Sequence, residues 1–138
     1  MRDVAYVALG SNLGDRDAHL ARARAALAAL PRSRVIGMSA VEETAPIGPA
    51  GQGAYLNQMA AIETELSPLE LLAELQRIER EEGRVRRERW GARTLDLDIV
   101  AMREQRSTDP ACLVPHPELP HRDFWRRELD ELGAADIR

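Results

Sequence analysis

The order of strand-like and helical segments is the feature that most limits what this sequence can fold into. Short apolar or alternating segments typical of β-strands occupy residues 4–9, 34–42, 55–66 and 95–102. Helices are predicted between them, over residues 15–30 or 17–30 and over residues 67–82. The resulting order, β-α-β-β-α-β, predicts an α+β fold with a ferredoxin-like core, in which two helices pack on one face of an antiparallel sheet.

Local signals place the start of the second helix and add to this core. Ser67 and Glu70 form a capping box, with Pro68 at the first helical position. Prolines favour extended chain over residues 113–117. The core is therefore expected to gain a short additional strand, and a charged C-terminal helix is predicted over residues 124–132.

Length and charge limit the class of protein. The 138 residues suffice for one domain, spanning residues 1–138, with its own core. A formal net charge of -4 disfavours a general nucleic-acid binder, and no apolar run approaches the length of a membrane span. Cys112 is the single cysteine, which is compatible with a reducing cytoplasm. We expect a cytoplasmic monomer that acts on small molecules, without a nucleic-acid or membrane partner.

All 19 basic residues are arginines, and five of them gather in one loop. The absence of lysine excludes a Schiff-base mechanism and a P-loop, which needs Gly-Lys-Ser/Thr. The loop arginines are Arg84, Arg86, Arg87, Arg89 and Arg93. Their planar forks suit the oxygens of a triphosphate, and Trp90 among them suggests a lid. The alternative is a solvated basic loop that forms ion pairs with nearby glutamates.

Two aspartates follow this loop at positions i and i+2. On a strand, Asp96 and Asp98 share one face, while Leu95, Leu97 and Ile99 point into the core. Adjacent carboxylates repel each other unless a cation lies between them, and Mg²⁺ prefers oxygen ligands. Phosphate binders beside metal binders suggest chemistry on a nucleoside triphosphate. Two incidental acids on a solvated sheet face are the alternative.

Further polar and aromatic residues could complete a ligand site. Tyr55 and Asn57 share a strand face and, with Phe124, could hold a flat heterocycle and read its edge. Both aromatic residues could equally belong to the core. The loop over residues 44–47 could supply backbone donors and acceptors to the same ligand.

Two pairs of side chains are candidates for the nucleotide. Gln76 and Glu79 lie one turn apart and could reach the end of the strand that carries the aspartates. Each taken alone is typical of a helix surface. His116, held between two prolines, and Arg122 could complete a phosphate site, although a lone histidine is more often structural.

The run RWGARTLDLDI at residues 89–99 closely resembles the signature of the 6-hydroxymethyl-7,8-dihydropterin pyrophosphokinases. Other segments agree with that family in the same order, at residues 7–14, 44–48, 55–57, 76–79, 83–86 and 114–117. The resemblance implies a folate-pathway enzyme that transfers pyrophosphate from ATP to the hydroxymethyl group of the dihydropterin and releases AMP. It also implies two Mg²⁺ ions, with Asp96 and Asp98 as their ligands.

The resemblance assigns roles to individual residues. It implies a catalytic role for Arg84, Arg93, Asp96 and Asp98. It implies ATP binding by Gln76, Glu79, Arg86, Ile99, His116 and Arg122. It implies pterin binding by Thr44, Pro46, Ile47, Tyr55, Asn57, Trp90 and Phe124.

The sequence departs from the family pattern in three places. Ala111 and Leu113 stand where the family usually carries an arginine and a threonine that touch ATP, the arginine-rich loop is about one residue short, and the segment after Phe124 is more polar. A non-catalytic relative that binds pterin or nucleotide is therefore an alternative. A ferredoxin-like RNA-binding or regulatory domain is another, which the acidic balance disfavours.

Overall fold

A computed structural model describes residues 2–45, 53–83 and 94–137. The strands are β1 (Asp3–Ser11), β2 (Ser33–Met38), β3 (Glu42–Thr44), β4 (Tyr55–Thr64) and β5 (Asp96–Met102). The helices are α1 (Arg16–Ala28), α2 (Pro68–Glu81) and α3 (Asp123–Glu131), with a 3₁₀ turn η1 (Leu119–His121) before α3. None of the helices in these three ranges is long and apolar enough to cross a membrane.

The strands form one antiparallel sheet in the order β2-β4-β1-β5, and β3 pairs with β4 as well. The α+β class and the ferredoxin-like core predicted from the sequence are confirmed. The single strand predicted over residues 34–42 is instead two strands. Ser39 interrupts them, because its hydroxyl accepts the Met59 N–H at 2.8 Å and its carbonyl accepts the Gln58 side-chain amide at 2.7 Å. Side-chain hydrogen bonds thus satisfy the backbone where the regular ladder stops.

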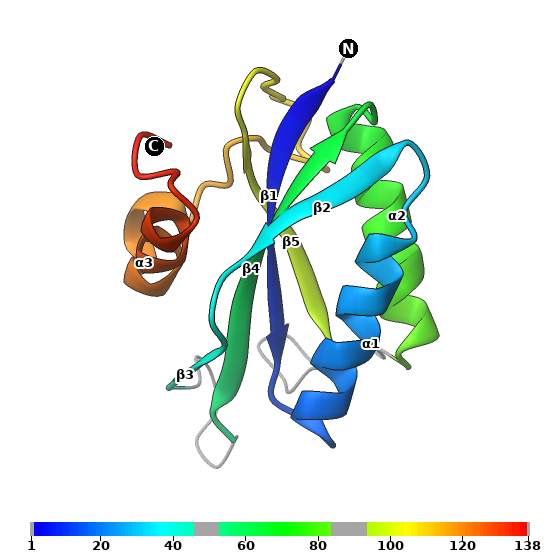
Figure 1. The fold of residues 1–138 in the computed structure, drawn as a ribbon, viewed down its shortest axis with the longest axis vertical. Coiled ribbons are helices and arrows are strands. Elements are labelled where there is room, and N and C mark those ends of the chain that lie inside the picture. The colour runs from blue at the N-terminus through cyan, green and yellow to red at the C-terminus, as the bar shows by residue number, and fades with distance from the viewer. Residues whose placement is uncertain (1, 46–52, 84–93, 138) are drawn as a thin grey trace.

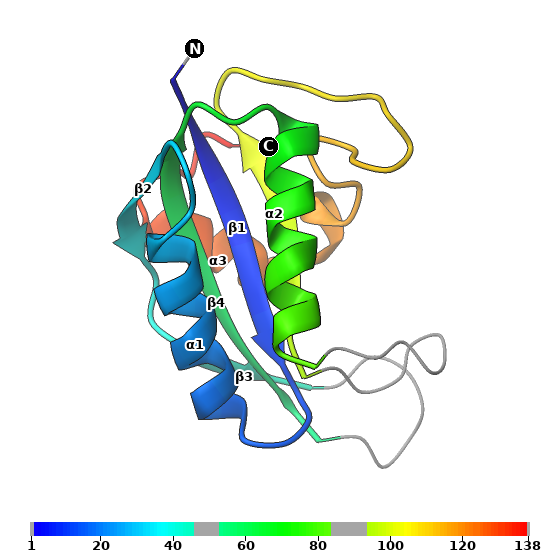
Figure 2. The same cartoon turned by 90° about the vertical axis from the view of Figure 1, so that its right-hand side faces the viewer.

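Helices cover both faces of the sheet, in three layers. Figures 1 and 2 show α1 and α2 on one face and α3 on the other. The first two helices bury their apolar stripes in a cluster with the inner face of the sheet: Leu20, Ala23, Leu27, Leu71, Leu75 and Ile78. A second cluster under α3 includes Tyr6, Ala8, Met59, Trp125 and Leu129. The predicted C-terminal helix therefore forms a layer of its own.

The helix starts follow the local signals. The Ser67 hydroxyl accepts the Glu70 N–H at 3.2 Å, and the Glu70 carboxylate accepts the Ser67 N–H at 2.9 Å, so the predicted capping box is confirmed. The hydrogen bond from the Ser67 backbone N–H is the main cause that holds the pKa of Glu70 below its usual value. Of the two predicted caps for α1, Asp15 is the one used, with its carboxylate accepting the Ala18 N–H at 3.0 Å.

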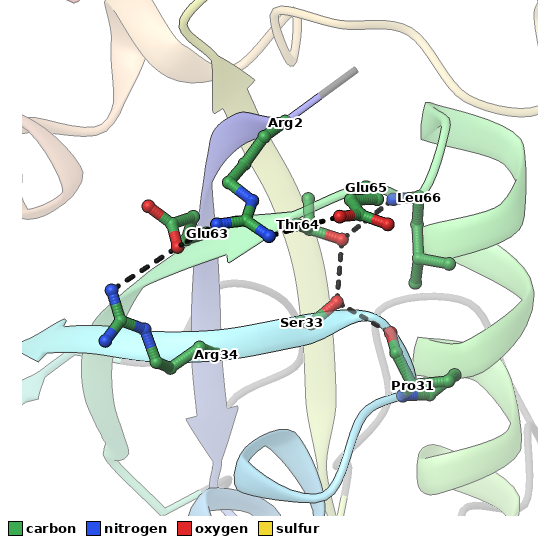
Figure 3. A network of polar contacts seen from close by, with 8 residues as sticks. All are labelled: Arg2, Pro31, Ser33, Arg34, Glu63, Thr64, Glu65 and Leu66. Carbon is green, nitrogen blue, oxygen red and sulfur yellow. Dashed lines mark hydrogen bonds and ion pairs between the residues drawn. The ribbon is translucent and has the colours of Figure 1, made fainter.

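A polar network holds the sheet at the end where β4 leads into α2, as Figure 3 shows. The hydroxyls of Ser33 and Thr64 lie 2.7 Å apart, and Thr64 also accepts the Leu66 N–H at 3.0 Å. Arg34 lies 3.4 Å from the Glu63 carboxylate, to which Arg2 also contributes an ion pair. Arginines at this end are thus neutralised by neighbouring acids.

Candidate active site

At the end of the sheet opposite to this network, residues of β4, β1 and β5 form rows across the three strands. Gly10 of β1 is opposite Asn57 of β4 and opposite Asp96 of β5. Two residues earlier in β1, and on the same face of the sheet, Ala8 is opposite Asp98 of β5. Side chains at alternate positions of a strand share a face, so these residues lie on the face that α3 covers further along.

The two aspartates are oriented as the sequence predicts. Asp96 and Asp98 are half-buried, whereas Leu95, Leu97 and Ile99 lie in the core on the opposite face. The carboxylates therefore stand at the boundary between the packed sheet and solvent, where oxygen ligands are accessible to a cation.

A bulge in β5 follows the aspartates, and the segment that contains His116 is hydrogen-bonded to it. Tyr6 is opposite Ala101 and Val7 is opposite Ile99, so Val100 is an extra residue in β5. The Val100 carbonyl accepts the backbone N–H of His116 at 2.8 Å. Bulges commonly re-aim the chain next to active sites, and this one connects His116 to the strand of the aspartates.

Glu79 of α2 reaches this strand, as predicted from its position. It is 7% exposed, and its carboxylate accepts the Leu97 N–H at 2.7 Å. Leu97 lies between the two aspartates, so Glu79 fixes the backbone that carries them. Gln76, one turn earlier, is exposed on the helix surface.

The end of α2 is fastened to α1 near the same end of the sheet. The Glu82 carboxylate accepts the Arg22 Nε–H at 2.8 Å and lies 2.7 Å from His19 Nδ1. The Arg22 hydrogen bond holds the pKa of Glu82 below its usual value, with His19 adding to that effect and burial opposing it. This cluster therefore sets the position of the last described turn before residue 84.

On the β4 side of the row, the side-chain amide of Asn57 contacts the hydroxyl of Thr44. Asn57 is buried, and its amide donates to Thr44 Oγ1 at 2.6 Å. Thr44 is opposite Tyr55, whose half-buried ring lies against Gly10: a Cβ on this glycine would be 3.4 Å from Tyr55 Cδ1. Phe124, at the start of α3, is partly buried in the second cluster.

His116 is bonded to β5 through Val100, and its ring lies near Asp98. Its Nδ1 accepts the Glu118 N–H at 3.0 Å, so a neutral ring carries its proton on Nε2, which lies 3.9 Å from Asp98 Oδ1. Burial lowers the pKa of His116 below its usual value, Arg122 adds to this effect and Glu118 opposes it. The ring is thus set to donate a hydrogen bond toward the carboxylates.

A pocket of about 210 Å³ opens beside Asp98 and His116. Its remaining lining is apolar apart from the thiol of Cys112: Leu72, Leu97, Ile99, Pro110, Ala111, Leu113 and Pro117. An apolar pocket with a few polar groups at one end is typical of a small-molecule site. Ala111 and Leu113, which form one of the three departures from the family pattern, line this pocket.

Six of the predicted site residues lie outside the described residues: Pro46, Ile47, Arg84, Arg86, Trp90 and Arg93. Sequence reasoning missed Gly10, whose place in the row depends on strand register. It also gave no role to Trp125, whose indole lies against the His116 ring and under the Arg122 guanidinium. The local signal for Trp125 was its position three residues after Arg122, a spacing that brings side chains together at a helix start.

The carboxylates of Asp96 and Asp98 suit a hard cation. Among the described residues no group of three or more His, Cys, Asp or Glu side chains could hold a metal. Mg²⁺ commonly binds proteins through only one or two carboxylates and completes its shell with substrate phosphates and water. A pair of acids is therefore a sufficient protein contribution when a triphosphate is bound.

The chain is similar to several known proteins. A family profile described as 7,8-dihydro-6-hydroxymethylpterin-pyrophosphokinase (HPPK) matches residues 6–134. The chain is 46% identical over 133 residues to the 2-amino-4-hydroxy-6-hydroxymethyldihydropteridine pyrophosphokinase of Haemophilus influenzae, covering 96% of this chain and 82% of that protein. It is 45% identical over 133 residues to the protein of the same name from Pseudomonas aeruginosa, with the same two coverages. For the Bacillus subtilis protein of that name, the identity is 42% over 132 residues, covering 96% and 79%.

Proposed function

The chain belongs to the 7,8-dihydro-6-hydroxymethylpterin-pyrophosphokinase family, and we propose that Asp96 and Asp98 are the centre of its active site. The enzyme transfers pyrophosphate from ATP to the hydroxymethyl group of 6-hydroxymethyl-7,8-dihydropterin in folate biosynthesis. The hydroxyl oxygen of the substrate loses its proton to solvent and bonds to the β-phosphorus of ATP, as the bond from that phosphorus to the α–β bridging oxygen breaks and AMP is released.

The observation that carries the proposed site is the row of Asn57, Gly10 and Asp96 across three hydrogen-bonded strands. An amide that can read a heterocycle and an acid that can hold a cation stand on either side of a residue without a side chain. This geometry supports binding of the pterin on the β4 side and of the ATP phosphates on the β5 side.

On the phosphate side, Asp96 and Asp98 would hold two Mg²⁺ ions. Bound Mg²⁺ neutralises phosphate charge and orients the reacting oxygens. His116 Nε2, which carries the proton in the neutral ring, would donate to a phosphate oxygen near Asp98. Arg122 would add positive charge, as would Arg84, Arg86 and Arg93 of the loop.

The base and ribose of ATP would lie in the 210 Å³ pocket that Ile99 and His116 help to line. Glu79 supports this side by fixing the backbone at Leu97. The exposed Gln76 on the same helix is included as an ATP contact because of the family resemblance. The apolar lining, including Leu113, favours packing against the faces of a flat base.

On the pterin side, the ring would stack between Tyr55 and Phe124. Asn57 and Thr44 would read its polar edge, since their hydrogen-bonded pair offers both an acceptor and a donor group. The proposal extends to Pro46 and Ile47 at this edge and to Trp90 as a cover.

A nucleotide product assay tests the site. We expect the wild-type chain to release AMP, and not ADP, from ATP only when both Mg²⁺ and the dihydropterin are present. Asp96→Asn and Asp98→Asn should each lower the rate of AMP formation about 100-fold or more, because the charge that binds Mg²⁺ is removed. Asp130→Asn, at an exposed position of α3, is the matched control and should keep normal activity. Near-normal turnover in either site variant would refute the assignment.

We also propose that residues 1–138 act as a single domain and as a monomer in the cytoplasm. The one cysteine described, Cys112, is buried as a free thiol, which fits a reducing compartment. Light scattering coupled to size-exclusion chromatography would test the monomer, and a mass of about twice 15.4 kDa would contradict it.

A further inference from the structure

Trp125 occupies a position behind two residues of the proposed phosphate site. It is 2% exposed and belongs to the core cluster under α3. The His116 ring meets it edge to face, with centroids 5.0 Å apart and planes at 85°. The guanidinium carbon of Arg122 lies 4.5 Å from the centre of the indole ring. One buried side chain thus contacts both groups.

The contact with Trp125 adds to the hydrogen bonds that hold His116 in place. Its backbone N–H is bonded to Val100, its carbonyl accepts the Leu119 N–H at 3.1 Å, and its Nδ1 accepts the Glu118 N–H. The indole lies against the ring, and the edge-to-face geometry is a favourable one for aromatic pairs. Nε2 is thereby kept on the side of Asp98.

The orientation of the Arg122 guanidinium depends on the indole more strongly than that of the His116 ring does. Its Nε is buried and has no hydrogen-bond partner among the described residues, and Glu118 Oε1 lies 4.0 Å from it. A guanidinium held over an indole face gains a cation–π attraction without using its N–H donors. The terminal N–H groups are therefore left available for an anion, while the plane of the group is fixed.

We propose that Trp125 is a positioning residue that orients His116 and Arg122 toward the triphosphate of ATP. This inference rests on the proposed function of the site. Because Trp125 is buried, it would act from behind His116 and Arg122 and not by touching a substrate. It would reduce the conformational freedom that these two residues lose when ATP binds. Trp125 also meets Phe124, but at 6.2 Å between ring centroids this contact is longer than those with His116 and Arg122, so we expect a larger effect on the affinity for ATP than on the affinity for the pterin.

A purely structural role for Trp125 predicts something different. Loss of a core side chain would lower the stability of α3 and, through Phe124, would affect the pterin as much as the nucleotide. Leu129 provides the comparison, since it is 1% exposed, lies one turn further along α3 and belongs to the same cluster. Leu129→Ala removes core packing without removing the ring.

The test measures KM for each substrate and kcat in Trp125→Leu, Trp125→Phe and Leu129→Ala, below the unfolding temperature of each variant. We expect Trp125→Leu to raise KM for ATP about tenfold, with kcat and KM for the pterin within about twofold. Trp125→Phe keeps a ring and should show a smaller rise. Leu129→Ala should leave both KM values within about twofold, despite its lower stability. An equal rise in KM for ATP in Leu129→Ala would overturn the proposal.

A double-mutant cycle with Arg122→Ala separates this inference from the proposed function. If Trp125 acts through Arg122, the fold-increase in KM for ATP of the double variant should be smaller than the product of the fold-increases in Arg122→Ala and Trp125→Leu. Trp125→Phe replaces the leucine variant in the cycle if that variant does not fold. If the two substitutions act independently on KM for ATP, the positioning role is refuted. The proposed function would still stand if the aspartate variants lose activity. Loss of the aspartate effect would instead refute the active-site assignment.

Discussion

At the scale of single residues, Glu79 shows how a buried acid can support a site without lying at its centre. Its carboxylate accepts the N–H of Leu97, between the two aspartates. Glu79→Ala should lower the free energy of unfolding by about 1–3 kcal/mol, because a buried N–H loses its partner. It should also raise the Mg²⁺ concentration needed for half-maximal activity. Glu79→Gln keeps an acceptor oxygen and should lose less.

Urea unfolding and Mg²⁺ titrations of AMP formation would check both effects. Glu81→Ala on the same helix is the control, because Glu81 is exposed and pairs with Arg77 at the surface. If Glu79→Ala is as stable as this control, the hydrogen bond to β5 has no structural importance.

At the scale of elements, the start of α2 depends on its capping box. Ser67→Ala removes the acceptor of the Glu70 N–H and should cost about 0.5–2 kcal/mol of unfolding free energy. Glu70→Gln keeps the reciprocal bond to the backbone of Ser67 and should change stability little. Chemical denaturation of both variants measures the difference, and a Ser67→Ala protein of wild-type stability would contradict it.

An acidic residue, Glu128, is among the buried residues of α3. Glu128 is 2% exposed, and neither of its carboxyl oxygens has a hydrogen-bond partner among the described residues. Burial raises the pKa of Glu128 to about 9, with Glu42 of β3 and Glu131 adding to the shift and Arg127 opposing it. The folded protein therefore holds a proton on Glu128 at neutral pH that the unfolded chain releases.

The sign of the pH dependence follows from this proton. Because the folded-state pKa exceeds the unfolded value of about 4.5, stability falls as pH rises from about 4.5 to about 9. At pH 7 the loss is on the order of 3 kcal/mol. Glu128→Gln removes the titration, so its stability relative to the wild type should increase between pH 5 and pH 9. Parallel curves of unfolding free energy against pH would contradict this prediction.

At the scale of the whole molecule, the order of elements could be predicted from the sequence because it depends on local patterns. Apolar spacing identified α1 and α2, and the Ser67 capping box is complete within four residues. The common face of Asp96 and Asp98 also follows from strand geometry alone.

Features that depend on contacts between distant segments could not be predicted in this way. The split into β2 and β3 requires Ser39 to meet Met59, and the bulge at Val100 appears only once β5 pairs with β1. The contact of Trp125 with His116 and Arg122 depends on η1 turning the chain back over the sheet. The sequence analysis predicts α3 as a charged helix, but only packing shows which face of the sheet it covers.

Gly10 and its two neighbours across the strands have a consequence for the substrates that the enzyme can accept. Adjacent strands lie about 4.8 Å apart, so Asn57 and Asp96, two strands apart, are separated by about 10 Å of rigid sheet. Backbone hydrogen bonds set this span, and no change in loop length can stretch it. If the pterin binds at Asn57 and the phosphates bind at Asp96, as proposed, we expect an alcohol on a longer arm to place its oxygen beyond the phosphorus and to be a poor acceptor.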